Sequence, residues 1–319
     1  MGFLDVLYFI VPSAIFFAAP LILVAIGGVF SERSGVINIG LEGLMVLGAF
    51  VGILFNLLYA DVFGSATPWL ALIAAMVASL LLALLHAVAS ITFRADQVIS
   101  GVAINLLAIA LALYLVKLIF QKGQTDFITE RFPRYNVPIL SDIPIIGPMF
   151  FNQLYLTSVF AVVVAFVAWF VIYKTPFGLR LRAVGEHPMA ADTMGIKVNR
   201  MRYVAVMISG GLAGIGGAIY AQTITGDFGH ATINGQGFMA LAAMIFGKWH
   251  PLGAMGAALF FGFAQSLSIV GPSLPYIERI PNVFLLILPY VLTILALAGF
   301  IGRANAPKAI GKPYIKGNR

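Results

Sequence analysis

The sequence lacks cysteine and is poor in charged residues. Only 10% of its 319 residues are Asp, Glu, Lys or Arg, whereas soluble domains carry roughly 25%. Without cysteine there are no disulfides, no thiolate metal ligands and no cysteine nucleophile. The GxSxG and HExxH motifs and any paired-carboxylate spacing are missing as well. The sequence therefore predicts no catalytic residues, no metal site and no cofactor, and we do not expect an enzyme.

A phosphate-binding loop of the P-loop type is also missing. The glycine-rich stretch Gly210–Gly217 lacks the Lys-Ser/Thr pair of such loops and lies inside an apolar run. Glycines at this density favour close helix packing in lipid. If the protein drives active transport, its energy must come from a partner or from an ion gradient.

Apolar residues dominate the chain. They make up 61% of it, and the mean hydropathy is +1.00. Because a spanning helix needs about 20 mostly apolar residues, the sequence predicts an all-α polytopic membrane protein with about 8–10 transmembrane helices. Residues 1–302 form one transmembrane domain and residues 303–319 a basic tail. The predicted spans are 6–29, 43–60, 69–92, 98–120, 153–173, 203–223, 251–270 and 283–302, with a shorter apolar piece at 236–247.

The positive charges gather in a few segments. Residues 174–202 hold six of the 19 Lys and Arg, namely Lys174, Arg180, Arg182, Lys197, Arg200 and Arg202. Because basic loops of membrane proteins stay in the cytoplasm, this loop and the tail are predicted to be cytoplasmic. The net charge of +7 then reflects orientation in a membrane rather than nucleic-acid binding. Alternation places the loop 122–152 outside, and the N-terminus outside if 31–42 returns to the inner side.

Two segments of the chain resemble each other. Residues 42–49 match 236–243, and each copy follows an Asn and a Gly and opens an apolar helix. Chance similarity among apolar letters is the alternative explanation. Interrupted hydrophobic segments at corresponding places are typical of transporters, where broken helices present their ends near the middle of the membrane. We therefore predict broken helices, related like an inverted repeat, near 31–43 and 225–237.

Polar residues within these apolar segments are the candidates for a substrate pathway, because burying them in a membrane is costly. Each also has a structural reading: Glu42 as a helix cap, the amides as partners of broken backbone or of a neighbouring helix, and Phe228 as an interfacial aromatic. Phe228, with His230, can alternatively stack on a flat solute. The pathway candidates are Asn38, Glu42, Asn105, Phe228, Asn234 and Gln236.

The middle of the basic loop is less charged than its flanks. Residues 188–195 favour a short helix that Gly195 can end, with Ala190, Ala191 and Met194 on one side. A surface for anionic lipid headgroups explains the flanking charge. A docking site for a soluble partner explains the apolar face as well.

Three stretches carry a resemblance to a known family: 32–43, 95–105 and 181–195. They resemble the permease subunits of bacterial ABC importers, in the branch of ribose-type sugar and branched-chain amino-acid permeases. The chain is most similar to the shorter permease of guanosine or general nucleoside importers. The third stretch resembles the EAA-type loop, but no Glu immediately precedes its alanines.

The resemblance implies a multi-pass subunit of a bacterial cytoplasmic membrane that moves nucleosides by alternating access. Its implied partners are a second, homologous permease, a cytoplasmic ATPase and an extracellular substrate-binding lipoprotein. Residues of the coupling helix that docks on the ATPase would be Glu186, Ala190, Ala191, Asp192 and Gly195. A sugar or a branched-chain amino acid is the alternative solute. An ion-driven secondary transporter, with Glu42 as the titrating group, is the alternative mechanism.

Overall fold

The computed structural model describes residues 3–273, residues 306–316 and, between these ranges, only positions 283, 284, 287, 288, 291 and 294. Six helical stretches of this part are long and apolar enough to cross a membrane: Val6–Arg33, Leu41–Thr92, Gln97–Phe120, Leu156–Lys174, Val198–Thr225 and Pro251–Val270. The protein is therefore an all-α multi-pass membrane protein, as predicted. The predicted span 283–302 lies mostly outside the described residues.

The long helices follow the predicted spans. They are α1 (Phe3–Arg33), α2 (Leu41–Phe63), α3 (Thr67–Ala87), α4 (Gln97–Phe120), α6 (Leu156–Lys174), α9 (Val198–Tyr220) and α11 (Pro251–Val270). The shorter helices are α5 (Ile146–Phe150), α7 (Pro176–Glu186), α8 (Pro188–Thr193) and α10 (Gln236–Phe246). Two-residue strands β1 (Arg134–Tyr135) and β2 (Leu154–Tyr155) pair antiparallel. The 52-residue stretch Leu41–Thr92 turns at Gly64–Ala66, so α2 and α3 pack side by side.

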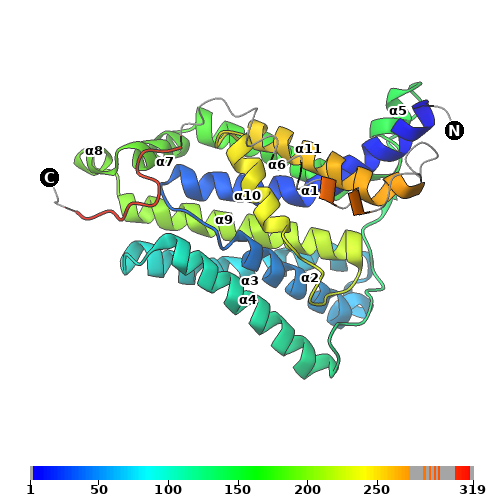
Figure 1. Ribbon diagram of the computed structural model, residues 1–319, viewed down its shortest axis with the longest axis horizontal. Coiled ribbons are helices and arrows are strands. Elements are labelled where there is room, and N and C mark those ends of the chain that lie inside the picture. The colour runs from blue at the N-terminus through cyan, green and yellow to red at the C-terminus, as the bar shows by residue number, and fades with distance from the viewer. Residues whose placement is uncertain are drawn as a thin grey trace.

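Helix α9 lies at the centre of the bundle and packs against α1, α2 and α3, whereas α4 diverges from the rest along one edge (Figure 1). Helices α7 and α8 lie at one end of the bundle together with the C-terminus. Helix α5 and the N-terminus lie at the opposite end (Figure 1). The basic loop 174–202 and the basic tail thus share one end, and the loop 122–152 belongs to the other.

The glycine-rich part of α9 allows α2 to approach it closely. A Cβ atom added at Gly48 of α2 would collide with the Gly214 backbone of α9. A Cβ at Gly217 would likewise collide with the Met45 carbonyl group. The predicted close packing of the Gly210–Gly217 stretch is confirmed, and it holds α2 against the centre of the bundle.

This contact yields a stability prediction. Gly48→Ala forces α2 and α9 apart, and overpacking of this kind costs about 1–3 kcal/mol. We expect its melting temperature in detergent to fall by several degrees. Gly256→Ala in α11 is the matched control, because a Cβ there meets no atom within 4 Å and alanine favours the helix. Equal melting temperatures for the two variants would contradict the packing account.

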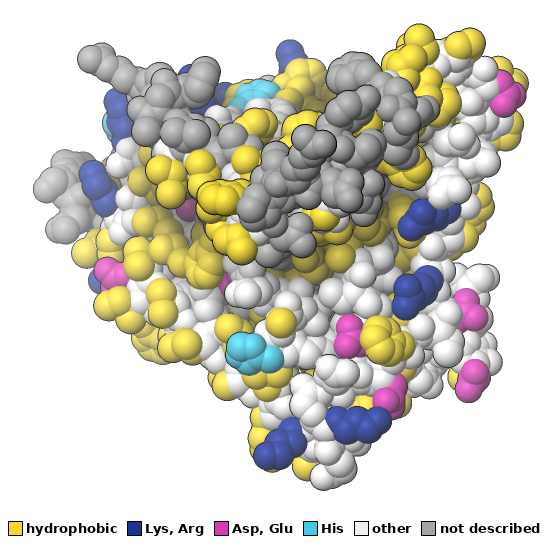
Figure 2. Space-filling view, turned by 45° about the vertical axis from the view of Figure 1, so that its right-hand side comes forward, with side chains coloured by type: hydrophobic (Ala, Val, Ile, Leu, Met, Phe, Trp, Pro, Cys, Tyr) yellow, Lys and Arg dark blue, Asp and Glu magenta, His cyan; other side chains and the backbone are white. Residues whose placement is uncertain are grey.

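The outer surface is apolar over the body of the bundle. Figure 2 shows hydrophobic side chains across the middle of one face, with charged side chains mainly toward its periphery. Helix α4 presents an exposed apolar row that includes Ile99, Leu106, Tyr114 and Leu118. Lipid or another membrane subunit must cover such a surface.

Candidate functional site

Two helices are interrupted in the bundle, close to the predicted positions. After Arg33 ends α1, residues 34–40 are non-helical until Leu41 begins α2. After a π-helical turn at Ala221–Thr225, residues 226–235 form a loop before α10. Both breaks release backbone groups that need partners inside the protein.

Glu42 joins the two breaks. Its Oε1 accepts a hydrogen bond of 2.6 Å from the Gly235 amide, and its Oε2 accepts one of 2.6 Å from the Gly237 amide. A carboxylate is favoured at a helix N-terminus, where free amides carry partial positive charge. Glu42 therefore caps α10, a helix that begins 194 residues later in the chain, although it stands in the first turn of α2. Gly237 must be small, because an added Cβ would lie 2.5 Å from the Glu42 Cα.

Asn105 of α4 caps the start of α2 from the other side. Its Oδ1 accepts a 2.7 Å hydrogen bond from the Gly43 amide, and its Nδ2 donates to the Ile39 carbonyl over 3.1 Å. One amide side chain thus satisfies a free donor and a free acceptor of the same break. These contacts agree with the structural reading of Asn105 as a residue that joins neighbouring helices.

The amides of Asn38 and Gln236 are both buried beside the breaks. Asn38 Nδ2 donates a 3.0 Å hydrogen bond to Ser209 Oγ, near the middle of α9. Within the described residues, Asn38 Oδ1 and Gln236 Oε1 have no hydrogen-bond partner. Both residues thus lie next to the junction of the breaks, but neither lines the cavity that opens there.

A cavity of about 400 Å³ lies against this junction. This volume falls within the roughly 300–1,000 Å³ of small-molecule sites. Four of the six predicted pathway residues line it: Glu42, Asn105, Phe228 and Asn234. The other lining residues are mostly apolar, namely Val46, Val102, Leu106, Ile109, Leu113, Gly229, His230, Ile233, Gly235 and Phe238. The sequence did not single out the apolar α4 residues Val102, Leu106, Ile109 and Leu113, because apolar residues at this spacing occur on any lipid-facing helix.

The aromatic residues of the cavity differ in exposure. Phe228 is only 2% exposed and packs edge-on against Phe50, with ring centroids 5.5 Å apart. Its backbone is fixed by Thr125, whose amide donates to the Phe228 carbonyl and whose Oγ1 accepts from the Phe228 amide, each over 2.9 Å. Phe228 is therefore a rigid wall. Phe238 is 49% exposed and His230 is exposed, so these two rings are accessible to a solute.

At the other candidate site, α8 forms over Pro188–Thr193, and Gly195 follows it with φ +81°. The three residues predicted to share one side of this helix, Ala190, Ala191 and Met194, differ in exposure. Ala191 is 4% exposed and packs inward, whereas Ala190 is exposed and Met194 is 82% exposed. Tyr314 of the C-terminal tail packs against Ala191, whereas Ala190 and Met194 stay exposed. Glu186 and Asp192 are half-buried and Gly195 is exposed.

The C-terminal tail ties α8 to the first helix break. Tyr314 of the tail packs with Val184, Ala191 and Val198. Upstream of it, the Ala309 amide donates to the Gly185 carbonyl over 2.9 Å, and the Gly311 amide donates to the Gly35 carbonyl over 3.1 Å. The tail therefore contacts both segments at once. Burial and the nearby Asp192 carboxylate raise the pKa of the Tyr314 phenol.

Arg202 of α9 completes this tie. It is 1% exposed, and its Nε donates to the Ser34 carbonyl over 3.2 Å while its Nη1 donates to the Lys312 carbonyl over 3.0 Å. The charge count of the basic loop included Arg202 as a solvated cation, but the structure buries it. A buried guanidinium needs several acceptors. Backbone carbonyls of two segments accept from its Nε and Nη1, while its Nη2 has no hydrogen-bond partner within the described residues.

A second polar cluster closes the same end of the bundle around the end of α1. Glu32 Oε2 accepts a 2.5 Å hydrogen bond from Trp249 Nε1, and Arg33 Nε donates to the Trp249 carbonyl over 2.8 Å. Arg33 Nη2 also donates to the Tyr173 hydroxyl over 3.1 Å. The sequence marked Glu32 and Arg33 as a polar break but gave no sign of Trp249, which lies more than 200 residues away.

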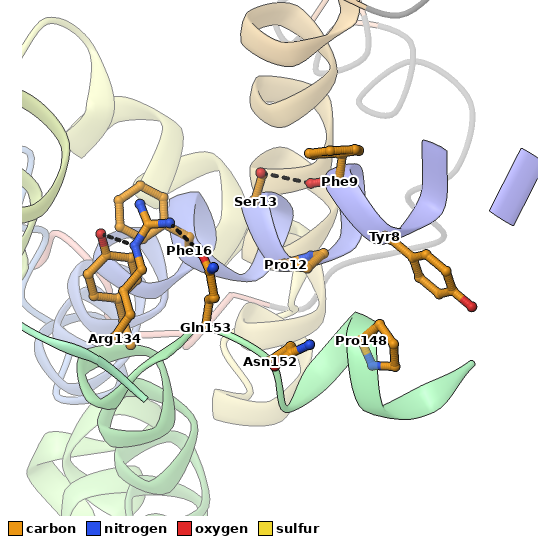
Figure 3. A pocket seen from close by; sticks show the side chains of 10 residues that line it. Tyr8, Phe9, Pro12, Ser13, Phe16, Arg134, Pro148, Asn152 and Gln153 are labelled. Atoms are coloured by element: carbon orange, nitrogen blue, oxygen red, sulfur yellow. Dashed lines mark hydrogen bonds between the residues drawn. The ribbon is translucent and has the colours of Figure 1, made fainter. Parts of the chain in front are cut away.

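The opposite end of the bundle carries a hollow of about 370 Å³ between α1, α5 and the β1–β2 pair (Figure 3). Arg134 is held in it by the Tyr155 hydroxyl over 2.8 Å and by Gln153 Oε1 over 3.1 Å. Its guanidinium also lies over the Tyr155 ring, 4.9 Å from the centroid. This end therefore offers a fixed, partly aromatic and partly polar surface.

Comparison with known proteins places the chain in a family of transport permeases. Residues 10–297 match the family described as branched-chain amino acid transport system / permease component, and the chain belongs to this family. It is 62% identical over 319 residues to the guanosine ABC transporter permease protein NupQ of Bacillus subtilis, and the match covers 100% of both chains. It is 52% identical over 316 residues, 99% of both chains, to the nucleoside ABC transporter permease protein NupC of Lactococcus lactis. A putative glucose ABC transporter permease protein of Haloferax volcanii, TsgC13, is 34% identical over 81% of this chain and 76% of its own.

Proposed function

We propose that this chain is a permease subunit of an ATP-driven ABC importer that carries nucleosides across the bacterial cytoplasmic membrane. The observation that carries the proposal is the 62% identity over the whole length to a guanosine permease. The full-length likeness to a nucleoside permease of another organism supports it. The solute then enters from the end that carries α5 and leaves at the end that carries α7 and α8.

The cavity at the two helix breaks is the proposed solute site. Its amides and the His230 ring can hydrogen-bond a sugar hydroxyl or a base edge, and Phe238 can pack on a flat base. Its one carboxylate, Glu42, is already bonded to two backbone amides. A neutral, flat solute with hydrogen-bonding groups suits this lining better than an ion does, because the Glu42 carboxylate already binds backbone amides of the protein itself.

A second permease is the proposed partner along α4. The cavity is lined on that side by Val102, Leu106, Ile109 and Leu113, and the neighbouring face of α4 is exposed and apolar. A membrane subunit placed against α4 would close the cavity from lipid. The homologous permease implied by the resemblance fits this position.

A cytoplasmic ATPase is the proposed partner of α8. Its outward residues, Ala190 and Met194, are exposed, so a groove on the ATPase can hold them. Movement of α8 would pass through Ala191 and Tyr314 to the tail, and from the tail to Gly35 and the first break. The energy of ATP hydrolysis would thus reach the solute site through a chain of packed contacts.

The extracellular lipoprotein is the proposed partner of the opposite end. The loop 122–152 and the hollow around Arg134 and Tyr155 form its surface there. The Thr125–Phe228 hydrogen bonds connect this loop directly to the wall of the cavity. A lipoprotein docked on this loop would therefore contact the segment that holds Phe228 in place.

Competition distinguishes the solute classes. In a strain that lacks its own nucleoside uptake, cells that express the complete importer should accumulate radiolabelled guanosine or uridine. Unlabelled nucleosides should reduce this uptake by more than tenfold, while ribose, glucose and leucine leave it unchanged. Accumulation of labelled glucose or leucine, with no effect of nucleosides, would assign the chain to the sugar or amino-acid branch instead.

The accessible polar residues of the cavity should affect affinity more than rate. Each of His230→Ala and Asn234→Ala removes one hydrogen-bonding side chain, which is worth about 0.5–1.5 kcal/mol. We expect KM for nucleoside uptake to rise roughly 2–13-fold, the same energy expressed as a ratio, with the maximal rate nearly unchanged. Asn199→Ala, an exposed position on α9 near α8, is the control and should leave KM unchanged. If both cavity variants had the wild-type KM, His230 and Asn234 would not be part of the solute site.

A further inference from the structure

A separate cavity of about 470 Å³ lies between α7, the loop after α8 and the first turns of α9. Three cations line it: Arg180, Lys197 and Arg200. Apolar side chains line the rest, namely Phe177, Met194, Ile196, Met201 and Val204, together with Gly195. The cavity therefore combines a positive rim with an apolar floor.

The three cations have no acidic partner within the described part of the chain. The one ion pair found there joins Lys122 to Asp126, at the opposite end of the bundle. No Asp or Glu lines the cavity. Three like charges around one hollow repel one another, so an anion bound between them would relieve that repulsion.

The floor continues into the membrane. Val204 and Ile208 lie one turn apart on α9 and are both half-buried, and α9 belongs to the apolar span Val198–Thr225. Arg200 lies one turn before Val204, at the start of the same span. A ligand that follows this surface must therefore be anionic at one end and apolar at the other.

We infer that this cavity binds the headgroup of an anionic phospholipid, with its phosphate between the three cations and an acyl chain along Val204 and Ile208. A soluble acidic partner could reach the rim but not the apolar row within the span. Membranes supply anionic headgroups at the height where basic residues border a span. The bound lipid bridges α7 and α9 and borders Met194 and Gly195, the residues that follow α8.

Titration of phosphatidylglycerol into the purified full chain, followed by native mass spectrometry, tests this inference. Phosphatidylcholine is the neutral reference. We expect wild-type protein to bind at least one phosphatidylglycerol with at least fivefold preference over phosphatidylcholine. The triple variant Arg180→Gln/Lys197→Gln/Arg200→Gln should lose that preference. Lys308→Gln/Lys312→Gln/Lys316→Gln removes the same charge from the tail and should keep it.

A charge-preserving variant separates binding from folding. Arg180→Lys/Arg200→Lys should retain the preference for phosphatidylglycerol. Only variants whose melting temperature equals that of the wild type are compared. The inference is overturned if the cavity and tail variants behave alike. It is also overturned if millimolar inorganic phosphate displaces the lipid, which would indicate a small-anion site. Loss of ATPase association in the cavity variant, with lipid preference unchanged, would instead assign the cavity to a protein partner.

Discussion

Replacing Glu42 by alanine should abolish nucleoside uptake while the protein still reaches the membrane. The substitution removes both acceptors that hold the start of α10, each bond being 2.6 Å long. Hydrogen bonds to a charged group contribute about 1.5–3 kcal/mol each. Two lost bonds at the junction of both helix breaks should leave uptake at least tenfold lower at equal protein level. Radiolabelled nucleoside uptake, normalised to protein detected by immunoblot, measures the effect.

Glu42→Gln is the matched variant. Its amide keeps one acceptor oxygen but turns a donor toward the second backbone amide, so uptake should fall between wild type and Glu42→Ala. A protonophore should leave the residual uptake unchanged, because the carboxylate acts as a helix cap. If Glu42→Gln were as inactive as Glu42→Ala and wild-type uptake collapsed with the protonophore, an ion-driven secondary transporter would be the better account.

Ala190→Trp should uncouple the permease from its ATPase. Ala190 is exposed on α8, so the bulky ring fits without disturbing the permease itself. In a groove that holds α8, the same ring would prevent docking. We expect more than 90% loss of uptake and loss of ATPase co-purification, with an unchanged melting temperature of the isolated chain.

Ala66→Trp provides the control at the other end of the bundle. Ala66 is also exposed, in the turn between α2 and α3. The Ala66→Trp variant should retain both uptake and ATPase co-purification. If the Ala190→Trp variant also retained both, α8 would not be part of the ATPase interface.

The helices and their breaks could be predicted because local composition decides them. Runs of about 20 apolar residues have few alternatives to a spanning helix. The predicted spans from residue 6 to residue 270 lie on helices of the structure, apart from residues 153–155, which precede α6. Glycine and asparagine before Leu41 and Gln236 interrupted the apolar pattern, and helices begin at these two residues. The density of glycines in α9 likewise predicted close packing.

The contacts between distant segments could not be predicted in the same way. Glu42 can cap α10 only because the two helix breaks lie side by side in the folded protein. No local sequence pattern indicates that they do. Arg202 was counted with the other cations of its loop, whereas the tail buries it. Ala191 faces inward because Tyr314 covers it, and the short apolar face of α8 gave no sign of which side would be covered.

The lining of the cavity at the two helix breaks could be predicted only in part, for a related reason. Glu42, Asn105, Phe228 and Asn234 stood out as polar or aromatic residues in unusual places, and all four line the cavity. Asn38 and Gln236 carry the same signal but are buried beside it. Polarity inside a membrane marks the breaks, and only the packing decides which polar groups face the open space.

Uptake of radiolabelled guanosine into proteoliposomes tests the central claim most directly. The complete importer would be reconstituted with the substrate-binding lipoprotein and guanosine on the outside and ATP enclosed. The account predicts accumulation that requires enclosed ATP, requires this chain, and is unaffected by collapsing ion gradients. Accumulation that continues without ATP and stops when the gradients collapse would contradict it.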